Sequence, residues 1–121
     1  MKQTILIVED NDVVCSSLQD WLSVTFSECT FMIAKSGEEA VEKVANQPPT
    51  IVLMDIGLPG MSGIQATRMI KAASPKTKVV MLTIYNDVNH RADASEAGAS
   101  AYLSKSKMHS ELVPLMKRLL S

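Results

Sequence analysis

Short, continuous runs of apolar residues recur along the chain. The first run, residues 5–8, reads Ile-Leu-Ile-Val and stops abruptly at Glu9 and Asp10. Similar runs lie at residues 30–34, 51–54, 79–82 and 101–103. Because most of these runs are continuous and rich in β-branched residues, instead of alternating with polar ones, they predict strands that are buried on both faces.

The first segment between two runs carries apolar residues at helical spacing. Residues 13–23 predict a helix, and Asn11 or Asp12 can cap its start. The expected buried face of this helix consists of Val14, Leu18, Trp21 and Leu22.

Two serines mark the starts of the next two helices. Ser36 stands three residues before Glu39, and Ser62 three residues before Gln65, which is the spacing of a capping box. The expected buried face of the first of these helices consists of Ala40, Val41, Val44 and Ala45.

The last two helices differ in how much they can bury. Residues 86–97 predict a helix whose only bulky apolar residue is Val88, so we expect it to pack weakly. The final helix contains Pro114, which predicts either a start near Ser110 or a bend at the proline. Its apolar face consists of Leu112, Leu115, Met116, Leu119 and Leu120.

Five strands that alternate with five helices predict one α/β domain over residues 1–121. The expected fold is a doubly wound, five-stranded parallel sheet of flavodoxin-like type, covered by helices on both faces. In such sheets ligands bind beyond the carboxyl ends of the strands. The functional residues are therefore expected at that edge.

Four of the five predicted strands end on residues capable of chemistry: Glu9 with Asp10, then Asp55, Thr83 and Lys105. Three carboxylates in one place repel one another unless a cation shares their charge. Oxygen ligands without histidine or cysteine favour Mg²⁺. A cation and a lysine around a carboxylate form a layout for phosphoryl transfer, and the threonine supplies a hydroxyl.

Each of these signals also has an ordinary structural explanation. An acidic pair such as Glu9 and Asp10 is often only a solvated strand end or a helix cap. Asp55 could be a turn residue, Lys105 a surface charge and Thr83 a strand residue. Their joint occurrence at the strand ends of one small domain favours a site.

The sequence also resembles a known family over its whole length. Four segments carry the resemblance: Val8-Glu9-Asp10, residues 54–63 (MDIGLPGMSG), Leu82-Thr83 and residues 98–105 (GASAYLSK). As an ordered set they resemble the receiver domains of bacterial response regulators. The stretch from Gly98 to Leu120 is most similar to regulators that carry a LuxR-type helix-turn-helix output domain.

The resemblance implies a role for each matching residue. Asp55 would accept a phosphoryl group from the phosphohistidine of a sensor histidine kinase, and Lys105 would pair with that group. Thr83 would move toward the phosphoryl group, and Tyr102 would be the aromatic switch that turns inward in response. The implied Mg²⁺ ligands are Glu9, Asp10, Asp55 and the main-chain carbonyl of Gly57. Homodimerisation on phosphorylation and a role in transcription regulation are further expectations, and the chain would catalyse only its own phosphorylation and dephosphorylation.

The sequence departs from the family pattern in three ways. Ile84 stands where a small residue is usual, which would restrict access to Asp55. Ser106 stands where proline is common, so a cis peptide bond is not expected there. No output domain follows Leu120, which leaves open a stand-alone receiver or one separated from its output domain.

Other functional classes fit the residues less well. A binding module without phosphorylation remains an alternative, although all the phosphorylation residues are present. A flavin carrier would need a phosphate-binding loop where acidic residues 9–12 stand. A phosphatase with an aspartate nucleophile would need a second acid soon after Asp55, and Ile56-Gly57-Leu58 offers none.

Composition narrows the setting. Twelve basic against thirteen acidic residues give a net charge of −1, so DNA contact is expected only through an output domain. No apolar run approaches the roughly 20 residues that span a membrane, and the expected location is the cytoplasm. Cys15 and Cys29 are expected in the core, and His90 and His109 on the surface.

Overall fold

Strands and helices alternate along the computed structural model, which describes residues 3–83 and 88–121. The strands are β1 (Thr4–Val8), β2 (Thr30–Ala34), β3 (Ile51–Asp55), β4 (Lys78–Thr83) and β5 (Ala101–Ser104). The helices are α1 (Asp12–Thr25), α2 (Gly37–Asn46), α3 (Gly63–Ala73), α4 (Val88–Glu96) and α5 (Met108–Leu120), and a 3-10 turn (Lys105–Lys107) precedes α5. The predicted alternation of five strands and five helices is confirmed.

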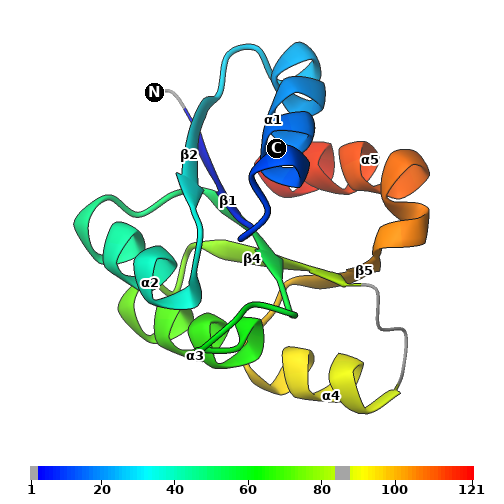
Figure 1. Cartoon of the computed structure of the whole chain (residues 1–121). Coiled ribbons are helices and arrows are strands. Elements are labelled where there is room, and N and C mark those ends of the chain that lie inside the picture. The colour runs from blue at the N-terminus through cyan, green and yellow to red at the C-terminus, as the bar shows by residue number, and fades with distance from the viewer. Residues whose placement is uncertain (1–2, 84–87) are drawn as a thin grey trace.

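The five strands form one parallel sheet in the order β2-β1-β3-β4-β5. Helices α1 and α5 cover one face, and α2, α3 and α4 cover the other (Figure 1). The predicted doubly wound fold is therefore confirmed. All strands point the same way, so their carboxyl ends share one edge of the sheet.

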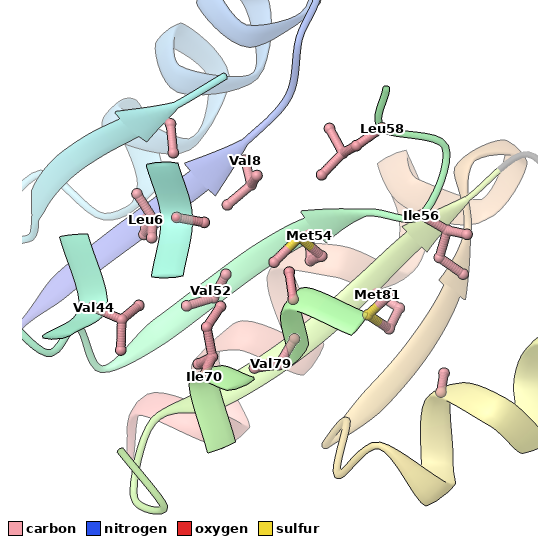
Figure 2. Close-up of a cluster of buried hydrophobic side chains, with 14 residues drawn as sticks. Leu6, Val8, Val44, Val52, Met54, Ile56, Leu58, Ile70, Val79 and Met81 are labelled. Carbon is pink, nitrogen blue, oxygen red and sulfur yellow. The ribbon is translucent and has the colours of Figure 1, made fainter. Parts of the chain in front are cut away.

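Alternate residues of the central strands supply two hydrophobic cores. Leu6, Met54 and Met81 are fully buried in the core beneath α2 and α3 (Figure 2). Ile5 and Leu53 belong to the core on the α1 and α5 face. Burial of each such side chain contributes about 1.5–3 kcal/mol to folding. The two edge strands bury less: β2 has one buried residue, Ala34, and β5 has one, Leu103.

Three helices begin on side-chain caps that the sequence predicted. Asn11 Oδ1 accepts a hydrogen bond from the backbone N–H of Val14 at 3.0 Å. Ser36 Oγ accepts one from Glu39 N–H at 3.0 Å, and Ser62 Oγ one from Gln65 N–H at 3.1 Å. These caps fix where α1, α2 and α3 start.

Some predicted burial patterns were wrong. The buried face of α1 consists of Cys15, Leu18 and Leu22, and Val14 is 41% exposed. Because successive helical residues are about 100° apart, Cys15 takes the inward position expected of Val14. Ala45 of α2 was expected on the buried face but is exposed. The buried residues of that helix are Gly37, Ala40 and Val44.

The last helix was expected either to start near Ser110 or to bend at Pro114. It starts at Met108, two residues before Ser110, and contains Pro114. The missing N–H of a proline removes one helical hydrogen bond, and the fully buried Leu112 and Met116 offset that loss by packing on the sheet. Ile84 and the predicted helix start at Asn86 lie outside the described residues.

The remaining sequence predictions can be placed briefly. Cys15 is buried as expected, whereas Cys29 is half-buried at the border of a core. His109 is exposed and His90 half-buried. The described residues contain no cis peptide bond, and none of the helices in the described part is long and apolar enough to cross a membrane.

Candidate functional site

The strand register brings the chemically capable residues to one edge of the sheet. Val8 pairs with Met54, so Glu9 and Asp55 follow on neighbouring strands. Asp55 in turn pairs with Leu82, the residue before Thr83. Thr83 pairs with Ser104, and Lys105 comes next. Residues far apart in the sequence therefore meet because their strands are parallel and adjacent.

Three carboxylates and one ammonium group form the centre of this edge. One oxygen from each of Glu9, Asp10 and Asp55 lies within 4.8 Å of the other two. Lys105 Nζ lies 3.6 Å from Glu9 Oε2 and 3.6 Å from Asp55 Oδ2. Lys105 thus bridges the two most buried carboxylates and offsets part of their mutual repulsion.

Burial changes the acidity of the Glu9 carboxyl. Only 7% of Glu9 is exposed, and this desolvation raises the pKa of its carboxyl above the usual value. The backbone N–H of Asn11, which donates to Glu9 Oε1 at 3.2 Å, opposes the rise in pKa. The nearby charge of Asp55 adds to the rise, and Lys105 opposes it. The site therefore favours any cation that neutralises these carboxylates.

The donor atoms of the cluster suit the Mg²⁺ that the sequence implies. All the convergent donors are carboxylate oxygens, the ligand type that hard cations prefer. Oxygens at about 2.0–2.1 Å from Mg²⁺ lie roughly 3–4 Å apart, so the observed cluster needs only small side-chain movements to hold one ion. The three residues fit a magnesium ion.

The other predicted site residues are Gly57, Thr83 and Tyr102. Gly57 donates its N–H to Asp55 Oδ1 at 3.1 Å, while the metal-binding role of its carbonyl stays a prediction. Thr83 is 1% exposed. Tyr102 is half-buried, and the guanidinium carbon of Arg91 lies 4.8 Å from the centre of its ring.

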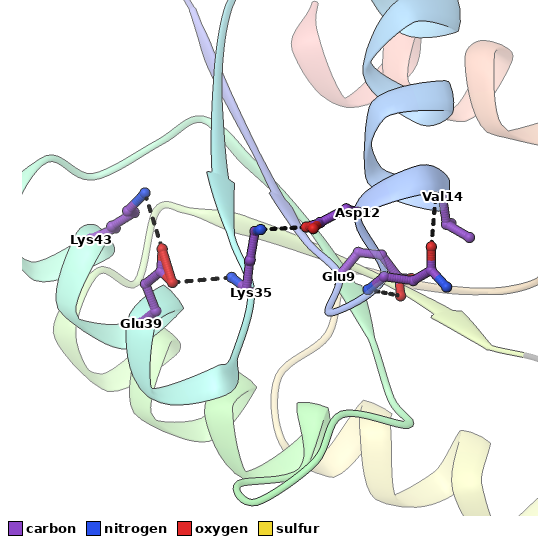
Figure 3. Close-up of polar contacts among 7 residues, drawn as sticks. Glu9, Asp12, Val14, Lys35, Glu39 and Lys43 are labelled. Atoms are coloured by element: carbon purple, nitrogen blue, oxygen red, sulfur yellow. Dashed lines mark hydrogen bonds and ion pairs between the residues drawn. The ribbon is translucent and has the colours of Figure 1, made fainter.

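A further set of polar contacts, around Lys35, was not predictable from the sequence. Lys35 pairs with Asp12, and its backbone N–H donates to Glu39 Oε2 at 3.2 Å (Figure 3). Lys35 thereby links the start of α1 to the start of α2. Its spacing from Asp12 matches no local motif, because the pairing of β1 with β2 creates this contact.

A surface hollow elsewhere on the molecule lacks this chemistry. It has a volume of about 940 Å³ and lies at the amino ends of the strands, near Phe26 and Leu120. Only Glu28 and Lys117 carry side-chain charges in its lining. Size alone therefore does not identify the functional site here.

Comparison with known proteins agrees with the geometry. The family model for the response regulator receiver domain matches residues 5–117. Transcriptional regulatory protein LnrK of Bacillus subtilis (strain 168) is 40% identical over 101 residues, which cover 84% of this chain and 46% of LnrK. Response regulator UvrY of Escherichia coli (strain K12) is 31% identical over 117 residues, which cover 97% of this chain and 54% of UvrY. The chain spans about half the length of these relatives.

Solved structures of response regulators are also similar to this chain. A two-component response regulator of the LuxR family from Aurantimonas sp. SI85-9A1 superposes with a TM-score of 0.91 at 29% identity, covering 99% of this chain and 86% of that one. The BeF3-activated DrrB receiver domain superposes with a TM-score of 0.87 at 28% identity, covering 99% of this chain and 98% of that one. The chain belongs to the response regulator receiver domain family, and it is similar to LuxR-type regulators.

Proposed function

We propose that the chain is a phosphoacceptor switch in which Asp55 takes a phosphoryl group from a sensor histidine kinase. The observation that carries this proposal is the position of Lys105 Nζ, 3.6 Å from both Glu9 and Asp55, beside a carboxylate cluster that fits a hard cation. A lysine and a cation site around one strand-end carboxylate are the parts that phosphoryl transfer requires.

The reaction makes one bond and breaks one. An oxygen of Asp55 attacks phosphorus, the bond between phosphorus and the histidine nitrogen breaks, and the imidazole leaves with the electron pair. Lys105 neutralises a phosphoryl oxygen and thereby releases its ion pair with Asp55. Glu9, Asp10, Asp55 and the Gly57 carbonyl would hold Mg²⁺, which would supply further charge neutralisation.

The residues near Asp55 relay its phosphorylation to the surface of the domain. Thr83 ends the adjacent strand, and its hydroxyl is the relay that moves toward the phosphoryl group. Tyr102 then turns toward the space that Thr83 leaves. The altered surface acts on a partner or a second copy in transcription regulation, with DNA contacted only through a separate output domain. The chain acts in the cytoplasm and modifies only itself, so it is not an enzyme with a separate substrate.

Intact-mass measurement after incubation with acetyl phosphate and Mg²⁺ tests the proposal. We expect one added phosphoryl group that hydroxylamine removes, as an acyl phosphate requires. Asp55→Asn should abolish the addition. Asp12→Asn is the matched control, because Asp12, the first residue of α1, is an exposed carboxylate that pairs with Lys35.

Two results would contradict the proposal. Equal labelling of the Asp55→Asn variant would remove the assignment of the nucleophile. A wild-type chain that is never labelled, by acetyl phosphate or by a phosphorylated kinase, would favour the alternative of a receiver-like binding module that works without phosphorylation.

A further inference from the structure

The described side chains of helix α4 bury little apolar area against the sheet. Of the residues whose side chains are described in α4, only Ala94 is fully buried, and Ala97 is buried just beyond its end. Both side chains are a single methyl group, so they bury little apolar area. Any additional contact between α4 and the sheet therefore has a large share in fixing the position of this helix.

The carboxyl end of α4 is fixed by its backbone. Ala99 N–H donates to Ala94 C=O at 3.0 Å, and Gly98 N–H donates to Ser95 C=O at 3.0 Å. Gly98 has a φ of +102°, and together these features form the glycine-based end known as a Schellman motif. Movement of α4 is therefore easiest toward its amino end.

A cation–π contact joins the amino-terminal half of α4 to β5. The guanidinium carbon of Arg91 lies 4.8 Å from the centre of the Tyr102 ring, within the range of a cation–π interaction. Tyr102 follows Ala101 on β5 and pairs in register with Met81, which is two residues before Thr83 on β4. Because side chains alternate along a strand, Met81 and Thr83 point to the same face of the sheet, and Tyr102 packs against the core on that face.

We propose that Arg91 is a positioning residue that holds the Tyr102 ring, and α4 with it, in the unphosphorylated arrangement. This inference rests on the proposed function of Asp55 and Tyr102. If Tyr102 turns inward on phosphorylation, the ring leaves its place beneath the guanidinium and the stack is lost. The contact then stabilises one of two states and so shifts the equilibrium between them.

Thermodynamic linkage determines whether the Arg91 contact raises or lowers the affinity for a phosphoryl mimic. A contact present only in the unphosphorylated state lowers the apparent affinity for any ligand that selects the other state. Arg91→Ala should therefore raise the affinity for beryllofluoride, a phosphoryl mimic, by about two- to fivefold, the range expected for an exposed cation–π contact. Arg91→Lys retains a cation and should lie between the wild type and the alanine variant.

The test is a double-mutant cycle read by beryllofluoride binding at saturating Mg²⁺, followed by ¹⁹F NMR. Arg91→Ala is made in the wild type and in a Tyr102→Leu background, which keeps an apolar side chain but has no ring. The inference predicts tighter binding in the first background and no change in the second. Arg68→Ala, which removes an exposed arginine from α3, is the control and should leave the affinity unchanged.

The outcomes separate this inference from the function on which it rests. If the wild type binds beryllofluoride and Arg91→Ala changes the affinity equally in both backgrounds, or in neither, the positioning role is overturned. If the wild type does not bind beryllofluoride at all, the proposed phosphoacceptor function fails first. A purely structural role would lower the melting temperature without the dependence of affinity on Tyr102.

Discussion

Helices α3 and α4 lie on the same face of the sheet, but they are attached to it in different ways. α3 begins directly on the backbone of the site: Gly63 N–H donates to Ile56 C=O at 3.3 Å, and Thr67 Oγ1 donates to Gly63 C=O at 2.8 Å. α4 has its buried alanines, its fixed end and the Arg91 contact. The difference suggests a division of labour in which α3 keeps Asp55 in place and α4 responds.

The largest predicted effect concerns the close packing of α3 against the backbone of the site. A Cβ atom at Gly63 would lie 2.4 Å from the Asp55 carbonyl oxygen and 2.9 Å from Ile56 Cα, so Gly63→Ala must displace the backbone of the site. We expect a loss of about 3 kcal/mol in the free energy of unfolding, measured by urea denaturation. Gly57→Ala is the control, because its Cβ would meet only Asp55 Oδ1 at 3.8 Å, and it should cost less than about 1 kcal/mol. Equal losses would show that the close approach of α3 is unimportant.

The second prediction compares the two helices in the unmodified protein. Amide hydrogen exchange at Ala94 in α4 should be about tenfold or more faster than at Ile70 in α3, because α4 can open locally while α3 opens with the whole domain. Both residues are 0% exposed, so solvent access to the side chain does not explain the difference. Equal protection would mean that α4 belongs to the same cooperative unit as α3.

The third prediction concerns Mg²⁺ binding at the carboxylate cluster that includes Asp55. Mg²⁺ at ten times its dissociation constant should stabilise the fold by about 1.4 kcal/mol, because it binds only where Glu9, Asp10 and Asp55 converge. Thermal unfolding with and without Mg²⁺ measures this gain. Asp10→Asn should remove most of it, whereas the nearby Asp12→Asn should retain it. An unchanged melting temperature in the wild type would contradict the site.

The smallest predicted effect is a dependence of stability on pH. Burial raises the pKa of the Glu9 carboxyl in the folded chain above its usual value of 4.5. Between the usual pKa and the raised pKa, the folded chain therefore binds more protons than the unfolded chain. The stability of the metal-free protein should therefore decline as pH rises through that interval. Glu9→Gln should remove this part of the decline in urea midpoints measured across pH without divalent cations. Parallel curves for both proteins would argue against the burial of Glu9 as its cause.

How far the sequence could lead depended on how local each signal was. The strands and the caps at Asn11, Ser36 and Ser62 were predictable because a few adjacent residues determine them. The exposure of Val14 was not, since Val14 and Cys15 are both apolar and only the packing of α1 distinguishes them. Likewise, a helix start at Met108 ahead of Pro114 depends on burial in the final fold.

The site shows the same boundary. Convergence of Glu9, Asp55 and Lys105 followed from the rule that parallel strands share an edge. The contacts of Lys35 with Asp12 and of Arg91 with Tyr102 had no counterpart in sequence spacing, because each joins two elements through side chains whose directions the fold sets. The convergence of the strand-end residues was therefore predictable, and these side-chain contacts between elements were not.

The distribution of site charges along the chain has a consequence for synthesis on the ribosome. Glu9, Asp10 and Asp55 all precede Lys105 in the chain. When β1 and β3 first emerge and can pair, their carboxylates meet without the ammonium group that later bridges them. Until Lys105 has been synthesised, the repulsion between these carboxylates is offset by cations from the solvent and not by this lysine.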